Sequence, residues 1–225
     1  IFKKLQTNVL QMNGSFAVVV QGKGWMFASV DRTRAIPLYY GKKGAGFYLS
    51  DNANWVRNQV ANSQMDKIAT KEFLLTGYVT GSETLFPSVK QLQAGECIWV
   101  RDRQGIPEDS THRFHPHARQ DFFDASEEDL YPLMDQILVN MFERLLESTK
   151  ERALVIPLSG GIDSRLIVAM LKRLGRDNVI CFSYGKQGSW ESEISRKVAA
   201  KLGYPWQFVH YTHRRWYQWF QSDER

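Results

Sequence analysis

Short apolar runs separated by glycine-containing turns dominate the first hundred residues. Residues 16–20 and 25–30 are rich in Val, Phe and Trp and are joined by Gln-Gly-Lys-Gly, and residues 37–40 and 46–50 flank a similar Gly-Lys-Lys-Gly segment. Runs of β-branched and aromatic residues joined by such turns are typical of antiparallel hairpins. We therefore predict two hairpins, followed by a last strand near residues 96–100.

One helix is expected between the second hairpin and the last strand. Trp55, Val56 and Val60 recur at helical spacing, and Asp51 precedes them where an N-cap would lie. A short acidic side chain there accepts hydrogen bonds from the free amides that begin a helix. The segment 1–101 is therefore expected to be a sheet-rich antiparallel domain.

The periodicity ends at residues 102–125, where Pro107 and Pro116 interrupt a polar stretch. Such interruptions mark loops, and we interpret this segment as a linker to a second domain at 126–225. His112, His115 and His117 within it have a spacing compatible with a transition-metal site. Without cysteines or paired carboxylates alongside them, we favour solvated side chains.

The second half of the chain alternates between helical and strand patterns. Ser126 and the acidic residues after it are typical of a helix start. An amphipathic stripe follows at Leu130, Met134, Ile137, Met141 and Leu145. Next, we predict strands at 153–158, 179–184 and 206–211, separated by helices at 163–174 and 191–202. This order indicates parallel βαβ units with right-handed crossovers.

Composition indicates a globular protein from a reducing compartment. The chain is 43% hydrophobic, but it has no apolar run of membrane-spanning length and no signal-peptide pattern. Cys97 and Cys181 lie inside apolar runs and are expected to be buried free thiols. We expect a cytoplasmic protein without a membrane partner. Because the chain starts with Ile1 rather than Met, we also expect a piece of a longer polypeptide.

The net charge of +5 favours anionic ligands but is too small and too dispersed to indicate nucleic-acid binding. The densest basic segment, 213–215, precedes Trp216, Tyr217, Trp219 and Phe220. Exposed aromatics beside arginines can stack on single-stranded nucleic acid, whereas aromatics at helical spacing are usually buried. We favour an amphipathic helix that packs on its own domain, and no nucleic-acid partner.

The clearest chemical motif is Ser-Gly-Gly-Ile-Asp-Ser at residues 159–164. It lies where a predicted strand ends and a helix begins, which is where α/β sheets bind ligands. Two glycines let a phosphate approach closely, while helix N-terminal amides and serine hydroxyls face the anion. Asp163 is better explained as a ligand of phosphate-bound Mg²⁺. The two commoner phosphate loops are absent from the sequence, and an ordinary turn would not require Asp and Ser here.

The segment 158–164 resembles the PP-loop of the N-type ATP pyrophosphatases, which cleave ATP between the α and β phosphates. Phe-Ser-Tyr-Gly at 182–185, followed by Glu191, resembles the second strand and downstream acidic residue of the asparagine synthetase branch. The first of these motifs is shared by several families.

Three upstream segments select the branch, because their order resembles the closing part of a class II glutaminase domain. They are Asn-Gly-Ser-Phe-Ala at 13–17, Asp31 with Ile-Pro-Leu-Tyr-Tyr at 36–40, and Leu-Gln-Ala-Gly-Glu at 92–96. The resemblance implies an α+β remnant of an Ntn-type glutaminase domain with an antiparallel sheet. An α/β domain of the PP-loop type, similar to the adenine nucleotide alpha hydrolases, would follow it.

The resemblance also implies a set of ATP-binding residues. They are Leu158, Ser159, Gly160, Gly161, Asp163, Ser164, Tyr184 and Gly185. Leu158 and Tyr184 would contact the adenine or ribose, the loop residues would hold the pyrophosphate, and Asp163 would bind Mg²⁺. Ser183 and Glu191 are further candidate ligands. Glu191 and Glu193 could equally be first-turn acids that the helix dipole favours.

The implied reaction is adenylation of a carboxylate, aspartate in the parent family, to acyl-AMP and pyrophosphate. Ammonia derived from glutamine then forms the amide, and Mg²⁺ neutralises charge on the pyrophosphate. The implied partners are therefore ATP, a carboxylate and ammonia, with a homodimer as one expected assembly.

The sequence departs from the family pattern in several places. The amino-terminal nucleophilic Cys of class II glutaminases is absent, and Cys97 has no neighbouring base, so we assign no catalytic residue and expect this chain to be catalytically incomplete. Val30, Arg34 and Arg165 stand where the family usually has Arg, Gly and Ser. These departures leave open a β-lactam synthetase-like or sugar-acid amidotransferase, or a nucleotide-binding module without turnover.

Overall fold

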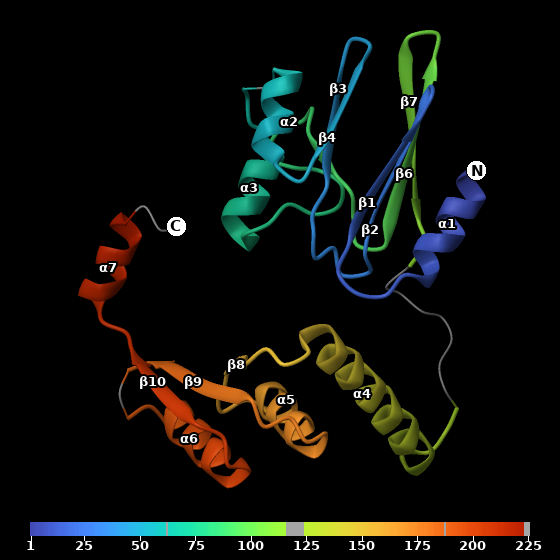
Figure 1. The fold of residues 1–225 in the computed structure, drawn as a ribbon. Helices are drawn as coiled ribbons and strands as arrows, with labels where there is room; N and C mark the ends of the chain where they lie inside the picture. Colours follow the sequence, from blue (N-terminus) through green and yellow to red (C-terminus); the bar gives the residue numbers. More distant parts are fainter. Residues whose placement is uncertain (62, 116–123, 187, 223–225) are drawn as a thin grey trace. The chain divides into compact units, whose positions relative to one another are not determined.

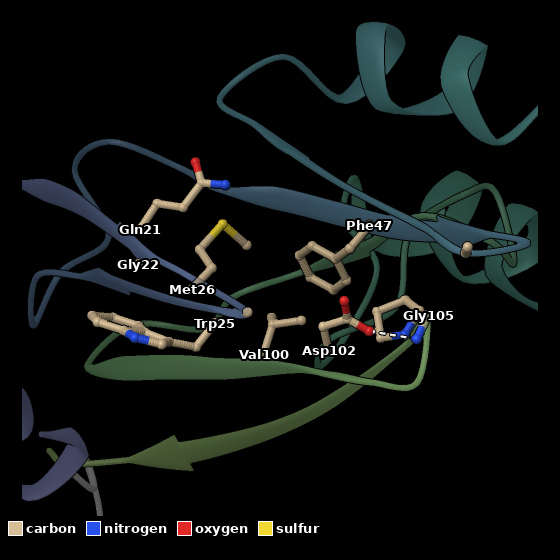
Figure 2. Close-up of a pocket in the computed structure, with 11 residues that line it drawn as sticks. Gln21, Gly22, Trp25, Met26, Phe47, Val100, Asp102 and Gly105 are labelled. Carbon is tan, nitrogen blue, oxygen red and sulfur yellow. Dashed lines mark hydrogen bonds between the residues drawn. The ribbon is translucent and has the colours of Figure 1, made fainter.

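The computed structural model describes residues 1–61, 63–115, 124–186 and 188–222. The chain divides into two compact units, Ile1–Phe122 and Phe123–Arg225, here called the amino-terminal and carboxy-terminal units. Figure 1 shows the helices and strands of each. No helix among the described residues is both long and apolar enough to span a lipid bilayer.

The amino-terminal unit contains a four-stranded antiparallel sheet in the order β1-β2-β6-β7 (Figure 1). Its strands are β1 (Ala17–Gly22), β2 (Trp25–Val30), β6 (Glu96–Arg103) and β7 (Ile106–Arg113). The first predicted hairpin is confirmed, although pairing of Gly22 with Trp25 leaves a shorter loop than expected. The last predicted strand is confirmed as β6, and it extends beyond residue 100.

The prediction of a linker at 102–125 is wrong for its first part, which forms the β6–β7 hairpin. Gln104 and Gly105 have φ values of 55° and 82°, and positive φ at both positions is what a type I′ turn requires. Strand β7 is polar and largely exposed, so no apolar alternation reveals it. It lies at the sheet edge, where Pro107 is tolerated. Residues 116–123 lie outside the described residues.

A second, three-stranded antiparallel sheet has the order β4-β3-β5. Its strands are β3 (Tyr39–Lys43), β4 (Gly46–Ser50) and β5 (Lys90–Gln91), so the second predicted hairpin is confirmed. Helix α2 (Ala53–Val60) is confirmed too, but Asp51 is not its cap. The helix begins later, and the Asn52 side chain accepts a hydrogen bond from the Trp55 N–H at 3.0 Å.

Two helices of this unit were not predicted from the sequence. In α1 (Phe2–Gln11), Phe2, Leu5 and Val9 recur at helical spacing and pack in the core cluster that contains Trp99. Helix α3 (Lys67–Thr76) is capped by Asp66 but buries only Ala69. The stripe of α1 fits helical periodicity and was overlooked, whereas α3 shows no continuous apolar stripe that a search for helical periodicity would find.

The carboxy-terminal unit contains the predicted parallel sheet, in the order β10-β9-β8. Its elements are α4 (Glu127–Thr149), β8 (Leu154–Pro157), α5 (Ile162–Arg173), β9 (Val179–Gly185), α6 (Trp190–Leu202), β10 (Trp206–His210) and α7 (His213–Gln221). The strands are added in sequence order, so right-handed crossovers place α5 and α6 on the same face of the sheet (Figure 1). The core of this unit lies between the helices and the sheet, and it includes Leu158, Val168, Leu171 and Cys181.

Helix α4 packs through a different face from the stripe seen in the sequence. Met134 and Ile137 of that stripe are 60% and 66% exposed. Phe142 is buried instead, with Leu138 and Leu146 packed beside it. The helix carries two neighbouring apolar stripes, and spacing alone does not identify the one that faces the core.

Helix α7 forms as predicted, but the interpretation that its aromatics pack on their own unit is wrong. None of its residues is buried, and the four aromatic side chains at 216, 217, 219 and 220 are exposed. Their helical spacing suggested burial, yet the described part of this unit offers no surface that covers them.

Candidate functional site

The predicted phosphate loop lies at the carboxyl ends of the parallel strands. Residues 158–161 connect the end of β8 to the start of α5. Pro157 pairs with Phe182 across β8 and β9, and Tyr184 pairs with Val209 across β9 and β10. The register therefore brings the ends of three strands to one edge of the sheet, which is where such sheets bind ligands.

Two serines hold the loop in shape. The Ser159 N–H donates to Ser164 Oγ at 3.1 Å, and the two hydroxyl oxygens lie 3.0 Å apart in a further hydrogen bond. The Gly161 N–H donates to Ser159 Oγ at 3.1 Å. Arg165, from the next turn of α5, donates its Nε–H to the Gly161 carbonyl at 3.1 Å. The loop is thus ordered before any ligand arrives.

The start of α5 differs from that of the other described helices that follow α1. Its N-cap is Gly161, with no side-chain hydrogen bond to the helix amides. Every other described helix after α1 has a side-chain cap, supplied by Asn52, Asp66, Ser126, Ser189 and Thr212. Uncapped amides at a helix N-terminus form a ready site for anions.

An indole packs against the loop. A methyl group placed on Gly160 would lie 3.0 Å from Cζ3 of Trp190 and 3.5 Å from Cα of Glu191. A side chain at position 160 would crowd this indole, so glycine suits the close approach of α6 to the loop. Trp190 is missed by the sequence reasoning, because nothing in its local pattern connects it with residues thirty positions earlier.

A cavity of about 310 Å³ opens beside the loop. Its walls bring together five of the predicted residues: Leu158, Ser159, Ser183, Tyr184 and Glu191. Pro157, Phe182 and Ser192 complete the wall. Gly160, Gly161, Asp163 and Ser164 lie in the adjacent loop and first turn of α5, and Gly185 ends β9. The volume lies at the lower end of the range of about 300–1,000 Å³ for small-molecule pockets.

A buried hydrogen-bond chain supports this cavity from behind. Ser183 Oγ donates to the Leu158 carbonyl at 2.6 Å and lies 2.5 Å from Ser195 Oγ. Trp206 Nε1 donates toward both hydroxyls, at 3.3 and 3.2 Å. Three elements, β9, α6 and β10, thereby fix the residue at which the loop begins. Ser195 and Trp206 were not sequence candidates, because only the folded sheet brings them together.

Leu158 and Tyr184 occupy different environments within the site. Leu158 is 2% exposed, and its N–H donates to the Phe182 carbonyl at 2.8 Å, so its side chain forms part of the core. Tyr184 is 56% exposed and stacks on Tyr211, with ring centroids 5.1 Å apart. Tyr184 therefore offers an accessible aromatic surface at the cavity wall.

The two acidic residues in the first turn of α6 make different contacts. Glu193 forms an ion pair with Arg196 at 2.9 Å, which gives it a role within the helix. Glu191 lines the cavity. Glu191 was the candidate ligand of the two in the sequence, and of the two it is the one that lies in the cavity wall.

The carboxylate and hydroxyl groups present fit a Mg²⁺ ion that is held partly by phosphates. Asp163 is exposed in the first turn of α5, next to Ser164. Mg²⁺ is usually bound by one or two carboxylates together with substrate phosphates. Among residues the structure describes, no cluster of three or more His, Cys, Asp or Glu side chains could hold a metal alone. His117 of the histidine-rich segment lies outside these residues.

The cysteines are buried free thiols, as predicted. Burial, together with the nearby Glu96 carboxylate, raises the pKa of Cys97 to about 11. Burial also raises the pKa of Cys181. Neither thiol is a nucleophile at neutral pH, because the thiolate is the reactive form.

Comparison with known proteins identifies relatives of both units. The glutamine amidotransferase domain family matches residues 3–114, and the asparagine synthase family matches residues 132–220. A probable glutamine-hydrolysing asparagine synthetase of Acanthamoeba polyphaga mimivirus is 28% identical over 201 residues, covering 85% of this chain and 34% of that protein. The chain thus spans about a third of the length of this curated relative.

A solved structure with a local likeness is the NH3-dependent NAD synthetase of Campylobacter jejuni. The match has 21% sequence identity and a TM-score of 0.34, and it covers 42% of each chain. The family assignment rests on the sequence matches, in which the amidotransferase domain precedes the synthase domain as the motifs predict. The chain thus carries a glutamine amidotransferase domain match followed by an asparagine synthase match, and it is similar to the glutamine-hydrolysing asparagine synthetases.

Proposed function

We propose that this chain contributes the nucleotide site of an ATP-dependent ligase that converts a carboxylate into an amide. The observation that carries the proposal is the uncapped N-terminus of α5, preceded by two glycines and adjoining the cavity with Tyr184 and Glu191. Free amides at this position suit the pyrophosphate of ATP, and an exposed aromatic ring suits its base. The amino-terminal unit is proposed to be part of a class II, Ntn-type glutaminase domain.

The proposed roles follow the positions of the side chains. Amides of the loop and of the first turn of α5 bind the phosphates, with Ser159 and Ser164 holding the loop. Asp163 would hold Mg²⁺, which supplies charge neutralisation on the departing pyrophosphate. Leu158, Tyr184 and Gly185 form the side that receives the adenosine. Ser183 supports Leu158, and Glu191 faces the ligand from α6.

The proposed chemistry has two steps. A carboxylate oxygen, from aspartate in the favoured case, attacks the α phosphorus, and the bond from that phosphorus to the pyrophosphate oxygen breaks. Ammonia released from glutamine then attacks the acyl carbon, AMP departs, and the surplus proton passes to solvent. The protein accelerates the first step by orienting the phosphates and stabilising the charge that develops on them.

The test uses the full-length protein with ATP, Mg²⁺, aspartate and an ammonium salt, which bypasses the glutaminase step. We expect AMP and pyrophosphate as products, with ¹⁸O passing from labelled carboxylate to AMP. Asp163→Asn should lower the rate about 10²–10³-fold, as loss of a charge-stabilising group does. Asp177→Asn is the matched control, since Asp177 lies beyond the opposite end of α5 and pairs with Lys172. ADP as the product would contradict the proposal.

Two alternatives predict different results in the same assay. A β-lactam synthetase-like or sugar-acid enzyme would release pyrophosphate with another carboxylate and ignore aspartate. A module that only binds nucleotide would bind ATP without releasing pyrophosphate from any carboxylate. The exposed carboxylate of Asp163 beside an uncapped helix favours a nucleotide bound together with Mg²⁺, because a carboxylate without a metal repels phosphate; the release of pyrophosphate decides between turnover and binding alone.

A further inference from the structure

Arg34 of the amino-terminal unit has an unusual backbone. Its φ is +54°, a left-handed conformation that side chains other than glycine adopt at a cost. Glycine would relieve that cost. The presence of a long charged side chain at such a position therefore calls for a reason in what the side chain does.

Asp31 imposes this backbone conformation. Its carboxylate is 2% exposed and accepts hydrogen bonds from the Phe16 N–H, from the Thr33 N–H and hydroxyl, and from the Ala35 N–H, at 2.7–3.1 Å. The Arg34 N–H donates to the Asp31 carbonyl at 3.1 Å. The turn is thus fixed from within, and the Arg34 side chain leaves it in a set direction.

The Arg34 guanidinium is also held in place. Nη2 donates to Gln91 Oε1 at 2.7 Å, and the group lies over the Tyr39 ring, 5.5 Å from its centroid. Gln91 is itself fixed, because its Nε2 donates to the carbonyls of Gly81 and Glu83. The Arg34 Nε–H, however, is buried without an acceptor among the described residues. A buried donor of this kind is costly unless something accepts from it.

Arg34 and its neighbours line a cavity of about 470 Å³. Most of the wall is apolar, with Phe73, Val79, Leu85 and Phe86 among its members. The acidic residue of the wall, Glu83, is neutralised by an ion pair with Lys90. The charge that the wall leaves unmatched is that of Arg34, since no salt bridge of Arg34 occurs in the described parts of the chain.

We propose that this cavity binds a small organic carboxylate with an apolar body, its carboxyl group on Arg34. A guanidinium matches carboxylate geometry, and Arg34 lines the cavity without an ion pair of its own among the described residues. An apolar wall with a single cation excludes both a neutral hydrocarbon and a bare inorganic anion as the preferred ligand. The site lies in the amino-terminal unit and is independent of the proposed ATP chemistry.

The test measures binding of hexanoate and hydrocinnamate to the full chain by isothermal titration calorimetry and ligand-observed NMR. We expect millimolar or tighter binding of at least one acid, and at least about tenfold weaker binding of its uncharged amide. Arg34→Gly should remove binding while folding is kept, because glycine suits the positive φ. Gln91→Glu should also remove it, since a carboxylate then occupies the guanidinium.

The matched control is Gln104→Gly, which relieves the same kind of backbone strain at φ +55° in the β6–β7 turn. This variant should bind the acids like the unchanged chain. Equal affinity of the acid for the unchanged chain and Arg34→Gly would overturn the proposal. So would failure of both acids to bind at about 10 mM, or equally tight Arg34-dependent binding of inorganic phosphate, which would indicate a bare anion site.

Discussion

Helices α5 and α6 follow consecutive strands of one sheet and begin at the same edge, but they begin differently. At α6, Ser189 caps the helix by accepting from the Ser192 N–H. At α5, Gly161 leaves the corresponding amides without a side-chain cap. A cap is the ordinary way to satisfy these groups. Its omission at one of two equivalent positions therefore marks the helix where an external ligand is expected to supply it.

Giving α5 the cap that α6 has should have the largest effect. The backbone at Gly161, φ −75° and ψ 158°, accommodates any residue, and a Cβ there meets only Ser159 Oγ, at 3.3 Å. Gly161→Asp should stabilise the protein by a few tenths of a kcal/mol, since glycine is itself a tolerated N-cap residue. Because the new carboxylate occupies the amides and repels phosphate, it should weaken ATP binding about 100-fold, or about 2.8 kcal/mol. Calorimetry measures both quantities.

Gly161→Ala is the control for the added bulk, since alanine adds a Cβ but neither caps the helix nor carries charge. It should lower ATP affinity much less than Gly161→Asp does. Unchanged ATP affinity in Gly161→Asp would refute the interpretation of α5 as an anion site.

The Asp31 turn is the opposite case, because the hydrogen bonds that its buried carboxylate accepts come from groups within the protein. Burial opposes ionisation of Asp31, but hydrogen bonds from Thr33, Phe16 and Ala35 together hold its pKa below the usual value. Its contribution to stability should therefore be fully present above the unfolded-state pKa of about 3.9 and be lost as the pH falls through the lower folded-state pKa. Asp31→Asn should cost about 2–3 kcal/mol at neutral pH.

Urea unfolding at neutral pH and across the acid range checks this expectation. The variant should lose the part of the acid dependence that Asp31 supplies, so the two stability curves should converge as the pH falls. Parallel curves would show that the carboxylate does not titrate as described.

Trp206→Phe tests the support behind the loop. It removes the indole donor from Ser183 and Ser195 while keeping most of the ring packing, so about 1–2 kcal/mol of stability should be lost. If this hydrogen-bond chain positions Leu158, the KM for ATP should rise in the variant while kcat changes little. Ser195→Ala should give the same split. A change in stability with no change in KM would show that the hydrogen bonds among Ser183, Ser195 and Trp206 have a structural role alone.

Ser189→Ala provides the smallest effect and completes the comparison. Loss of the α6 cap should lower the free energy of unfolding by about 1 kcal/mol and leave ATP affinity unchanged. Denaturant unfolding and a nucleotide titration of the same preparation measure both. A large drop in ATP affinity would mean that the start of α6 takes part in the site.

The parallel half of the fold could be predicted because local signals agree there. Apolar strands such as Val179–Gly185 alternate with helices that have clear starts and ends, so each element is marked by its own residues. Strand β7 could not be predicted in this way, since its side chains are polar and its pairing depends on the backbone. The packed face of α4 was hidden for another reason: two apolar stripes compete, and only the neighbouring helix decides between them.

The loop of the candidate site was accessible from sequence because its residues are contiguous. Ser195 and Trp206 were not, because they meet Ser183 only after three elements have assembled. Trp190 escaped similarly, since its contact is with the backbone of Gly160, which leaves no complementary side chain in the sequence. Contacts made to backbone, or across several elements, carry little signal in a single sequence.

The packing of Trp190 on Gly160 gives the loop its own optical reporter. An indole responds to changes in the polarity around it, and this one is largely exposed yet touches the place where the phosphates are proposed to bind. The difference in emission between the chain and its Trp190→Phe variant isolates that signal from the other tryptophans. Occupancy of the loop thereby becomes visible without a labelled nucleotide or a coupled assay.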